Sequence, residues 1–321
     1  MRLDSLFALH IPDGFLSVPV AIIGWVLLII TLFFALRQTR AQLGERQVPL
    51  MGILAAFVFA AQMINFPVAG GTSGHLLGGT LVAILLGPWA AALIMTSVIG
   101  VQALLFQDGG LLAIGFNAFN MGIITGFLGF GFYSLVRGIF GGSRAGMLVG
   151  AALGAWISVE AAAIATALQL AISGTSPLPI ALPAMVSVHA LIGIGEALIT
   201  VGALTFILQT RPDLVNTQIP ASTSGTRWVA VGILIALVVV LFSPLASPEP
   251  DGLERVAEDV GFLATAQEAP YTVLPDYTIP GIDNQALSTI LAGAVGTLVV
   301  AGLGYGIGRI AETRRKSQSQ A

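Results

Sequence analysis

The sequence predicts an all-α protein, a polytopic bundle of membrane-spanning helices. Apolar residues make up 56% of the chain and charged residues only 9%, whereas soluble domains carry about 25% charged residues. The mean hydropathy is +0.93. The apolar residues also gather in runs long enough to cross about 30 Å of hydrocarbon. These observations together exclude an ordinary soluble domain.

Each expected helix corresponds to one apolar run. Eight runs reach membrane length: Pro19 to Leu36, Leu50 to Phe66, Trp89 to Phe106, Leu111 to Leu135, Gly146 to Ile172, Met185 to Leu208, Trp228 to Leu245 and Ala286 to Gly306. A ninth run, Gly74 to Leu86, is short for a span. Because Gly87 and Pro88 join it directly to the next run, Thr72 to Phe106 is either a tight helical hairpin or a re-entrant segment. We therefore expect nine spans, with an error of one.

The basic residues predict the orientation of these spans. With nine spans, one side of the membrane holds Arg37, Arg40, Arg46, Arg137, Arg144, Arg211, Arg227, Arg309, Arg314, Arg315 and Lys316. Only Arg2 and Arg255 fall on the other side. Short loops rich in Lys and Arg face the cytoplasm. We expect a multi-pass membrane protein with its N-terminus outside and its C-terminus in the cytoplasm.

The chain divides into two parts joined by a linker. Residues 1–208 form the expected seven-helix bundle, 209–226 form a polar linker, and 227–321 form a module of two membrane helices around an acidic outer segment. Within that segment, Asp251 and Glu254 of the Pro-Asp-Gly-Leu-Glu sequence have the spacing of a helix capping box. The apolar face of the helix that follows is free to contact a partner.

Two of the three histidines stand in short segments rich in Gly or Pro. His10 precedes the turn sequence Pro12-Asp13-Gly14, and His75 ends a segment with three glycines. Imidazole is a common ligand of late transition metals. Since both fall on the expected outer side, we predict that His10 and His75 bind a metal ion, although an interfacial turn or tight helix packing would explain either segment alone.

Five further polar residues are expected near the mouth of this site: Asn65, Gln102, Asp108, Asn117 and Asn120. Amides and a carboxylate there would orient the imidazoles, while loop capping would explain about half of them equally well. His189, Glu160 and Glu196 lie inside expected spans, where ionisable groups need partners. They form either a proton or cation path or internal hydrogen-bond anchors.

Other classes of function lack their sequence signals. The chain has no cysteine and a net charge of −3, which excludes thiolate sites and disfavours nucleic-acid binding. The sequence contains no phosphate-binding Walker motif, no HExxH and no Ser/His/Asp arrangement. We therefore expect no enzymatic activity and no intrinsic cofactor, and any ATP-driven step would belong to another subunit.

Several motifs resemble a known family. They are HIPDGFLS at His10 to Ser17, the segment Asn65 to Gly79, QDGGL at Gln107 to Leu111, NAFNM at Asn117 to Met121, and HALIGIGEAL at His189 to Leu198. Over residues 10 to about 208 the chain resembles the nickel/cobalt substrate-binding (S) component of energy-coupling factor transporters, the CbiM/NikM family. Pro250 to Glu254 is similar to the small N component of the same systems, which implies a fusion of the two.

The resemblance implies a seven-helix S component of a prokaryotic cell (plasma) membrane, which works with a transmembrane T protein and two cytoplasmic ABC-type ATPases. It also implies a planar nitrogen site made by the terminal amine, the amide nitrogen and imidazole of a histidine at position two, and a second imidazole. Those imidazoles correspond to His10 and His75. Four nitrogens in a plane suit Ni²⁺, with Co²⁺ next.

The start of the chain departs from this pattern, because nine residues precede His10. Either Leu9 stands where an alternative start codon is read as methionine, or the extension is removed, or another group is the fourth ligand. We favour the alternative start, which peptide mapping of the mature terminus would decide.

We therefore expect a membrane subunit that captures a transition-metal cation for ATP-driven uptake, with Ni²⁺ favoured over Co²⁺. The acidic outer segment is expected to contact the mouth of the bundle and control loading. Two alternatives stay open: a proton-coupled secondary transporter that uses Glu160, Glu196 and His189, and a membrane metal sensor that transports nothing.

Overall fold

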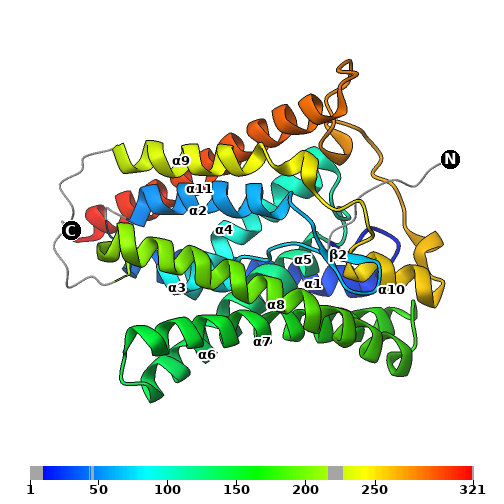
Figure 1. The fold of residues 1–321 in the computed structure, drawn as a ribbon, viewed down its shortest axis with the longest axis horizontal. Helices are drawn as coiled ribbons and strands as arrows, with labels where there is room; N and C mark the ends of the chain where they lie inside the picture. Colours follow the sequence, from blue (N-terminus) through cyan, green and yellow to red (C-terminus); the bar gives the residue numbers. More distant parts are fainter. Residues whose placement is uncertain (1–9, 43, 45–46, 216–226, 320–321) are drawn as a thin grey trace.

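The structure, a computed structural model, describes residues 10–42, 44, 47–215 and 227–319, so the question of the mature N-terminus falls outside the described residues. Long helices run side by side along the long axis of the molecule (Figure 1). The helices are α1 (Val18–Gln42), α2 (Gln47–Gln62), α3 (Gly79–Leu86), α4 (Pro88–Val101), α5 (Ile114–Ala118), α6 (Thr125–Ile139), α7 (Arg144–Ser173), α8 (Leu178–Thr210), α9 (Arg227–Val240), α10 (Gly252–Val260) and α11 (Gln285–Ser319). One antiparallel hairpin, of β1 (Phe66–Val68) and β2 (Thr72–Gly74), interrupts them.

Seven helices of the described part are long and apolar enough to cross a membrane, which confirms the predicted fold class. They cover Val18–Ala41, Pro88–Phe106, Ile114–Ile139, Arg144–Ser173, Leu178–Thr210, Arg227–Leu245 and Gln285–Thr313. The two other expected spans are the shorter helices α2, with 16 residues, and α3, with 8 residues. The chain is a polytopic helical membrane protein.

In the segment Thr72 to Phe106, which we expected to be a helical hairpin or a re-entrant segment, helix begins only at residue 79. α3 and α4 pack together and are separated by Gly87 alone, at φ 85°. Ahead of them, residues 72–78 are extended and end at Gly78, at φ 83°. Both dihedrals lie in the left-handed region that glycine enters without steric cost. The glycine-rich segment therefore forms a β-hairpin and an extended connection, which a count of apolar residues does not reveal.

Two helices contain a π-helical turn close to candidate site residues. α4 continues into the π turn Gln102–Phe106, and a second π turn, Phe119–Ile124, joins α5 to α6. Such turns are frequent at functional sites because the widened turn redirects side chains. They place Gln102 and Asn120 in the interior, each no more than 2% exposed.

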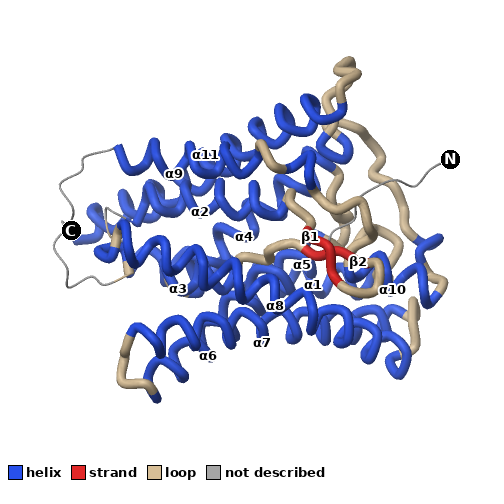
Figure 2. Tube along the Cα trace, viewed as in Figure 1, coloured by secondary structure: helices blue, strands red, loops and turns tan. Residues whose placement is uncertain are grey.

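The C-terminal module packs along the bundle. α9 and α11 contact α2, whereas α10 contacts α8 and β2 at the end of the molecule that holds the hairpin (Figures 1 and 2). The C-terminal ends of α1, α6, α8 and α11 lie at the opposite end (Figure 1). Arg40, Arg137 and Arg211 lie at the C-terminal ends of α1, α6 and α8, so these basic residues and the hairpin occupy opposite ends of the molecule.

Close contact between α11 and α2 depends on glycine. A Cβ atom at Gly296 would lie 2.2 Å from Cζ of Phe59, and one at Gly304 would lie 2.8 Å from the carbonyl oxygen of Met51. Small residues let membrane helices approach closely, and packing is their main source of association. The close packing of α11 against α2 thus attaches the C-terminal module to the bundle.

We expect Gly296→Ala to destabilise the protein by about 1–3 kcal/mol, because the added methyl group overpacks the contact with Phe59. The thermal unfolding midpoint of the detergent-solubilised chain measures the effect. Gly302→Ala on the same helix is the control, since a Cβ atom there meets nothing within 4 Å. Equal midpoints for the two variants would contradict the close packing.

Candidate metal-binding site

Three segments that are distant in sequence meet at the hairpin end of the bundle. They are the turn that begins at His10, the extended segment that contains His75, and the turn after α4 that contains Asp108. All three side chains are buried, with exposed fractions of 0%, 2% and 6% respectively. Buried ionisable groups need specific partners, so the contacts of each one are informative.

The backbone next to His10 is held by Asn117. The amide N–H of Ile11 donates to Oδ1 of Asn117 over 2.8 Å, and Nδ2 of Asn117 donates back to the carbonyl oxygen of Ile11 over 3.0 Å. Asp13 anchors the same turn, because its carboxylate accepts the N–H groups of Leu111 and Leu112, each over 2.9 Å. The side chains of Asn117 and Asp13 thus take the place of the backbone hydrogen-bond partners that a helix would supply.

A chain of amides determines which nitrogen of His10 is free. Nε2 of Gln102 donates to Oε1 of Gln62 over 2.8 Å, and Gln62 in turn donates to the carbonyl oxygen of Leu77. Gln102 therefore presents its oxygen to Nε2 of His10, 3.1 Å away. In this arrangement Nε2 carries the proton of a neutral imidazole and Nδ1 keeps a lone pair.

Nδ1 of His10 faces a carboxylate. It lies 3.0 Å from Oδ1 of Asp108, yet neither atom has a hydrogen-bond partner of acceptable geometry. Two ligands at right angles on one ion, each at a distance of about 2.1 Å, would lie about 3.0 Å apart. The pair is therefore suited to share a proton or a cation.

His75 presents a second free nitrogen. Its Nδ1 lies 2.8 Å from the carbonyl oxygen of Leu76 and so carries the proton, which leaves the lone pair on Nε2 without a partner. The His75 and His10 ring centroids are 5.9 Å apart, with the planes at 5°. His75 lies ahead of α3, outside the membrane-spanning helices, and burial and the nearby His10 lower its pKa to about 4. The imidazole is neutral at pH 7, as a metal ligand must be.

In the described part of the chain, no three His, Asp or Glu side chains are arranged to hold an ion as they stand. The structure therefore places two imidazoles and a carboxylate near one another without closing a coordination sphere around them.

The C-terminal module reaches Asp108 through Tyr277. The hydroxyl of Tyr277 donates to Oδ2 of Asp108 over 2.7 Å, and its ring stacks on Phe106 with centroids 4.6 Å apart. Burial alone would raise the pKa of Asp108, whereas a protonated His10 and the hydrogen bond from Tyr277 outweigh burial and lower it. Asp276 and Tyr277 have φ of 50° and 58°, a conformation that costs non-glycine residues about 1–3 kcal/mol each.

The same module also contacts the strand before His75. The N–H of Ser73 donates to the carbonyl oxygen of Pro250 over 2.8 Å, and Oγ of Ser73 donates to the carbonyl oxygen of Glu249. Oδ1 of Asp251 accepts the N–H of Glu254 over 2.7 Å, as the capping box predicts. The Pro-Asp-Gly-Leu-Glu turn is thus hydrogen-bonded to β2.

The three polar residues inside the spans do not pair with one another in the described structure. Glu196 on α8 accepts the N–H groups of Leu77 and Gly78, over 2.6 and 3.0 Å, and so anchors the backbone after His75. Nδ1 of His189 lies 2.7 Å from the carbonyl oxygen of Met185. Oε1 of Glu160 on α7 is buried without a hydrogen-bond partner. No hydrogen-bonded relay connects these described side chains.

Two expected mouth residues have other contacts. Asn120 exchanges hydrogen bonds of 2.8 Å with Gln169 on α7, and the carbonyl oxygen of Asn65 accepts the N–H of Ser247. Gln102, Asp108 and Asn117 do surround His10. Sequence reasoning missed Gln62 and Tyr277. Gln62 could have been found from the sequence, because it is a polar residue in an apolar run. The sequence around Tyr277 carries no comparable signal.

A bundle of membrane helices with buried imidazoles at one end is typical of a membrane transport component. Comparison with known families agrees: residues 10–214 match the family CbiM, described as the cobalt uptake substrate-specific transmembrane region, and residues 226–313 match the PDGLE domain. The chain therefore belongs to the CbiM family. It is a transmembrane component of transition-metal uptake, a transport protein without an enzymatic domain.

Curated relatives and a solved structure are similar to this chain over most of its length. A putative fused nickel transport protein NikMN of Archaeoglobus fulgidus is 37% identical over 95% of this chain and its own full length. A fused nickel transport protein NikMN of Rhodobacter capsulatus is 29% identical over 96% of this chain and 99% of its own. The crystal structure of a truncated transition metal transporter, 36% identical, covers 62% of this chain and 98% of its own, with a TM-score of 0.57.

We expect Tyr277→Phe to weaken metal binding about 10-fold, because groups that orient a ligand typically contribute 10–100-fold. The variant keeps the ring on Phe106 and loses the hydrogen bond to Asp108. Calorimetric titration with Ni²⁺ measures the change. Tyr271→Phe is the matched control, since that hydroxyl donates to the carbonyl oxygen of Leu104 at an exposed position. Equal Ni²⁺ affinity of the two variants would show that the hydrogen bond from Tyr277 to Asp108 does not contribute to metal binding.

Proposed function

We propose that this chain captures Ni²⁺, or with lower preference Co²⁺, from outside the cell through His10 and His75 and presents it for ATP-driven import. The observation that carries the proposal is the meeting of two free imidazole nitrogens, Nδ1 of His10 and Nε2 of His75, beside the carboxylate of Asp108. Nickel or cobalt is the cargo, and the chain needs no cofactor of its own.

The donor set supports the choice of metal. Neutral imidazoles suit late divalent metals, and binding rises along the series through Co²⁺ to Ni²⁺. Two relatives named fused nickel transport proteins cover nearly the whole of this chain, and a third covers 74% of it. Relatives named cobalt transport protein CbiM cover 52% to 78% of it, so the bundle itself is similar to carriers of either ion.

The ends of the bundle support the direction of transport. Arg40, Arg137 and Arg211 lie at the helix ends opposite the hairpin (Figure 1), and basic residues of this kind mark the cytoplasmic side of a membrane protein. The N-terminus and the metal site then face outside, and the C-terminus lies in the cytoplasm. The proposal includes the division of the chain into a bundle over 1–208, a linker over 209–226 and a module over 227–321.

The partners follow from the family and from the chemistry of the sequence. Import against a gradient needs an energy source, and the chain has no Walker motif. In this proposal a transmembrane T protein lies beside the chain in the lipid bilayer, and two cytoplasmic ABC-type ATPase subunits hydrolyse the ATP. The sequence gives no reason to add nucleic acid to the partners.

We also propose that the C-terminal module controls metal loading, which its contacts support. Its Pro-Asp-Gly-Leu-Glu turn binds β2 next to His75, and Tyr277 binds Asp108 next to His10. One module thus contacts both halves of the candidate site. We propose that its docking holds the two histidine segments in the position that accepts the ion.

We expect His10→Ala and His75→Ala each to weaken Ni²⁺ binding by more than about 100-fold, since each would remove one imidazole ligand. Calorimetric titration of the purified chain measures binding, and its mature N-terminus is mapped on the same sample. Ser187→Ala is the control, because that exposed hydroxyl bonds only to the carbonyl oxygen of Pro183. Unchanged binding in both histidine variants would refute the site, and uptake by the chain alone under a pH gradient would favour the proton-coupled alternative.

We expect replacement of residues 249–283 by a Gly/Ser linker of equal length to slow ⁶³Ni²⁺ uptake at least about 10-fold in cells that also produce the T and ATPase partners, since groups that orient metal ligands contribute 10–100-fold. The change removes the contacts to Ser73 and Asp108. Circular dichroism checks that the bundle remains helical. Uptake at the unmodified rate would show that the module does not control loading.

A further inference from the structure

The outer segment of the C-terminal module, residues 246–284, carries an excess of negative charge. It contains eight acidic residues and one basic residue, whereas the whole chain has a net charge of only −3. The basic residue, Arg255, is paired with Asp259 over 3.0 Å. Those of the acidic residues that are exposed take no part in the candidate site. The eight are Glu249, Asp251, Glu254, Glu258, Asp259, Glu268, Asp276 and Asp283.

The first of three exposed acids in this segment lies beside the turn that begins at His10. The N–H of Gln267 donates to the carbonyl oxygen of Asp13 over 2.8 Å, and the two residues form an isolated antiparallel bridge. Glu268 comes directly after Gln267 and is exposed. It therefore stands at the edge of the His10 turn.

The second exposed acid, Asp276, lies beside Asp108. It directly precedes Tyr277, whose hydroxyl donates to Oδ2 of Asp108. Partial burial raises the pKa of Asp276 to about 6, and the charges of Asp108 and Glu268 are further causes. A carboxyl group with this pKa is largely ionised at pH 7. These three carboxylates are thus close enough to repel one another, and a nearby cation would relieve the repulsion.

The third exposed acid, Glu249, lies beside the strand that leads to His75. Its carbonyl oxygen accepts the hydroxyl of Ser73 over 2.8 Å. A Cβ atom at Gly71 would lie 3.8 Å from Oε2 of Glu249, which places the carboxylate at the tip of the β1–β2 hairpin. None of the three exposed acids forms an ion pair within the described part of the chain. Together they border all three segments of the candidate site.

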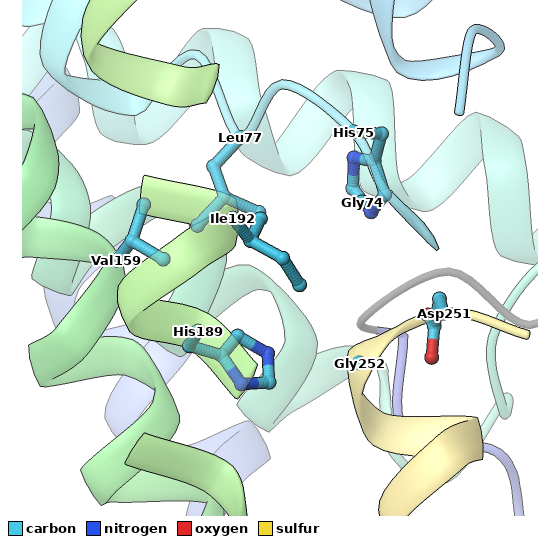
Figure 3. Close-up of a pocket in the computed structure, with 8 residues that line it drawn as sticks. All are labelled: Gly74, His75, Leu77, Val159, His189, Ile192, Asp251 and Gly252. Carbon is cyan, nitrogen blue, oxygen red and sulfur yellow. The ribbon is translucent and has the colours of Figure 1, made fainter. Parts of the chain in front are cut away.

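Buried carboxylate oxygens without partners lie inward of these acids. Oδ1 of Asp108 and Oδ2 of Asp251 make no hydrogen bond in the described structure, although the residues are only 6% and 2% exposed. Asp251 lines a small cavity of about 10 Å³ together with His75 (Figure 3). Burial raises the pKa of Asp251 well above its usual value, and the charges of Glu254 and Asp108 raise it further. Unpaired buried acceptors are rare, and both mark a region of negative potential where positive charge is favoured.

The rest of the molecule gives this negative potential a direction. Arg40, Arg137 and Arg211 lie at the helix ends opposite the hairpin (Figure 1). The hairpin end therefore attracts cations and the other end repels them. Surfaces of one sign raise the local concentration of counter-ions and increase association rates by about 10–10³-fold.

We propose that the outer segment is an electrostatic entry path, which concentrates divalent cations at the mouth of the site and speeds their capture by His10 and His75. The inference rests on the proposed function, because it uses the same cargo and the same site. Glu249, Glu268 and Asp276 act on the ion from a distance and need not hold it. Charges of this kind change the rate of association, whereas the groups that hold a ligand set the rate of dissociation.

The test measures the association and dissociation rates of Ni²⁺ with the full-length chain in a neutral detergent, by stopped-flow mixing with a chromophoric chelator that reports free Ni²⁺. The triple variant Glu249→Gln, Glu268→Gln and Asp276→Asn removes three charges and preserves side-chain shape. Asn also tolerates the left-handed conformation of residue 276.

At an ionic strength of about 0.01 M the Debye length is about 30 Å, so the exposed acids act at long range. We expect the triple variant to bind Ni²⁺ about 10-fold more slowly there, with a dissociation rate changed by less than about 2-fold. At about 1 M salt the Debye length is about 3 Å, and we expect the two association rates to become equal.

Gln267→Glu and Gln38→Glu are a matched pair of control variants. Each adds one negative charge without a change of shape, the first beside the His10 turn and the second near the C-terminal end of α1. We expect only Gln267→Glu to speed association at low ionic strength, by about 2-fold.

Equal association rates for the native chain and the triple variant at low ionic strength would overturn the entry path. A change confined to the dissociation rate would also overturn it, because the acids would then hold the ion instead of guiding it. In both cases the native chain still binds Ni²⁺ and the proposed function stands. A native chain that binds no Ni²⁺ would contradict the proposed function itself, so the two failures are distinguishable.

Discussion

The structure depends on one constraint: within the apolar bundle, every non-helical backbone group must find a polar partner inside the protein. The turn at His10 and the extended segment at His75 are such regions. Asn117 pairs with both backbone groups of Ile11, and Glu196 accepts two N–H groups after His75. These side chains supply the partners that a helix would otherwise provide, so the site can exist without a water-filled channel.

The same constraint explains why the C-terminal module packs closely against the bundle. β2 is a short strand with one hairpin partner, and its other edge would be left unpaired. The Pro-Asp-Gly-Leu-Glu turn fills that edge through Pro250, and α10 begins directly beside it. Further along the module, the N–H of Leu274 donates to the carbonyl oxygen of Leu105, close to the residues that flank His10. The same contacts therefore satisfy backbone hydrogen-bonding groups and hold the residues of the candidate site in position.

Polarity is distributed unevenly along the bundle. The hairpin end concentrates buried imidazoles, amides and carboxylates, while the lipid-facing surface of α1 exposes Ile22, Ile29 and Phe33. Buried charges are costly unless they are paired, and each imidazole here has one engaged nitrogen and one that is free. A cation is the natural complement of such free lone pairs, which links the packing of the bundle to the chemistry proposed for it.

The sequence by itself determined the membrane class, the apolar helices, the capping box at Asp251 and the two histidine segments, because hydropathy and turn residues act over short stretches of chain. It could not determine that Asn120 would pair with Gln169, that Glu196 would anchor Leu77, or that Tyr277 would bind Asp108. These contacts join residues 49, 119 and 169 positions apart. Only the packing of whole helices decides which distant polar groups meet, because a hydrogen bond depends on position in space and leaves no periodic signal along the chain.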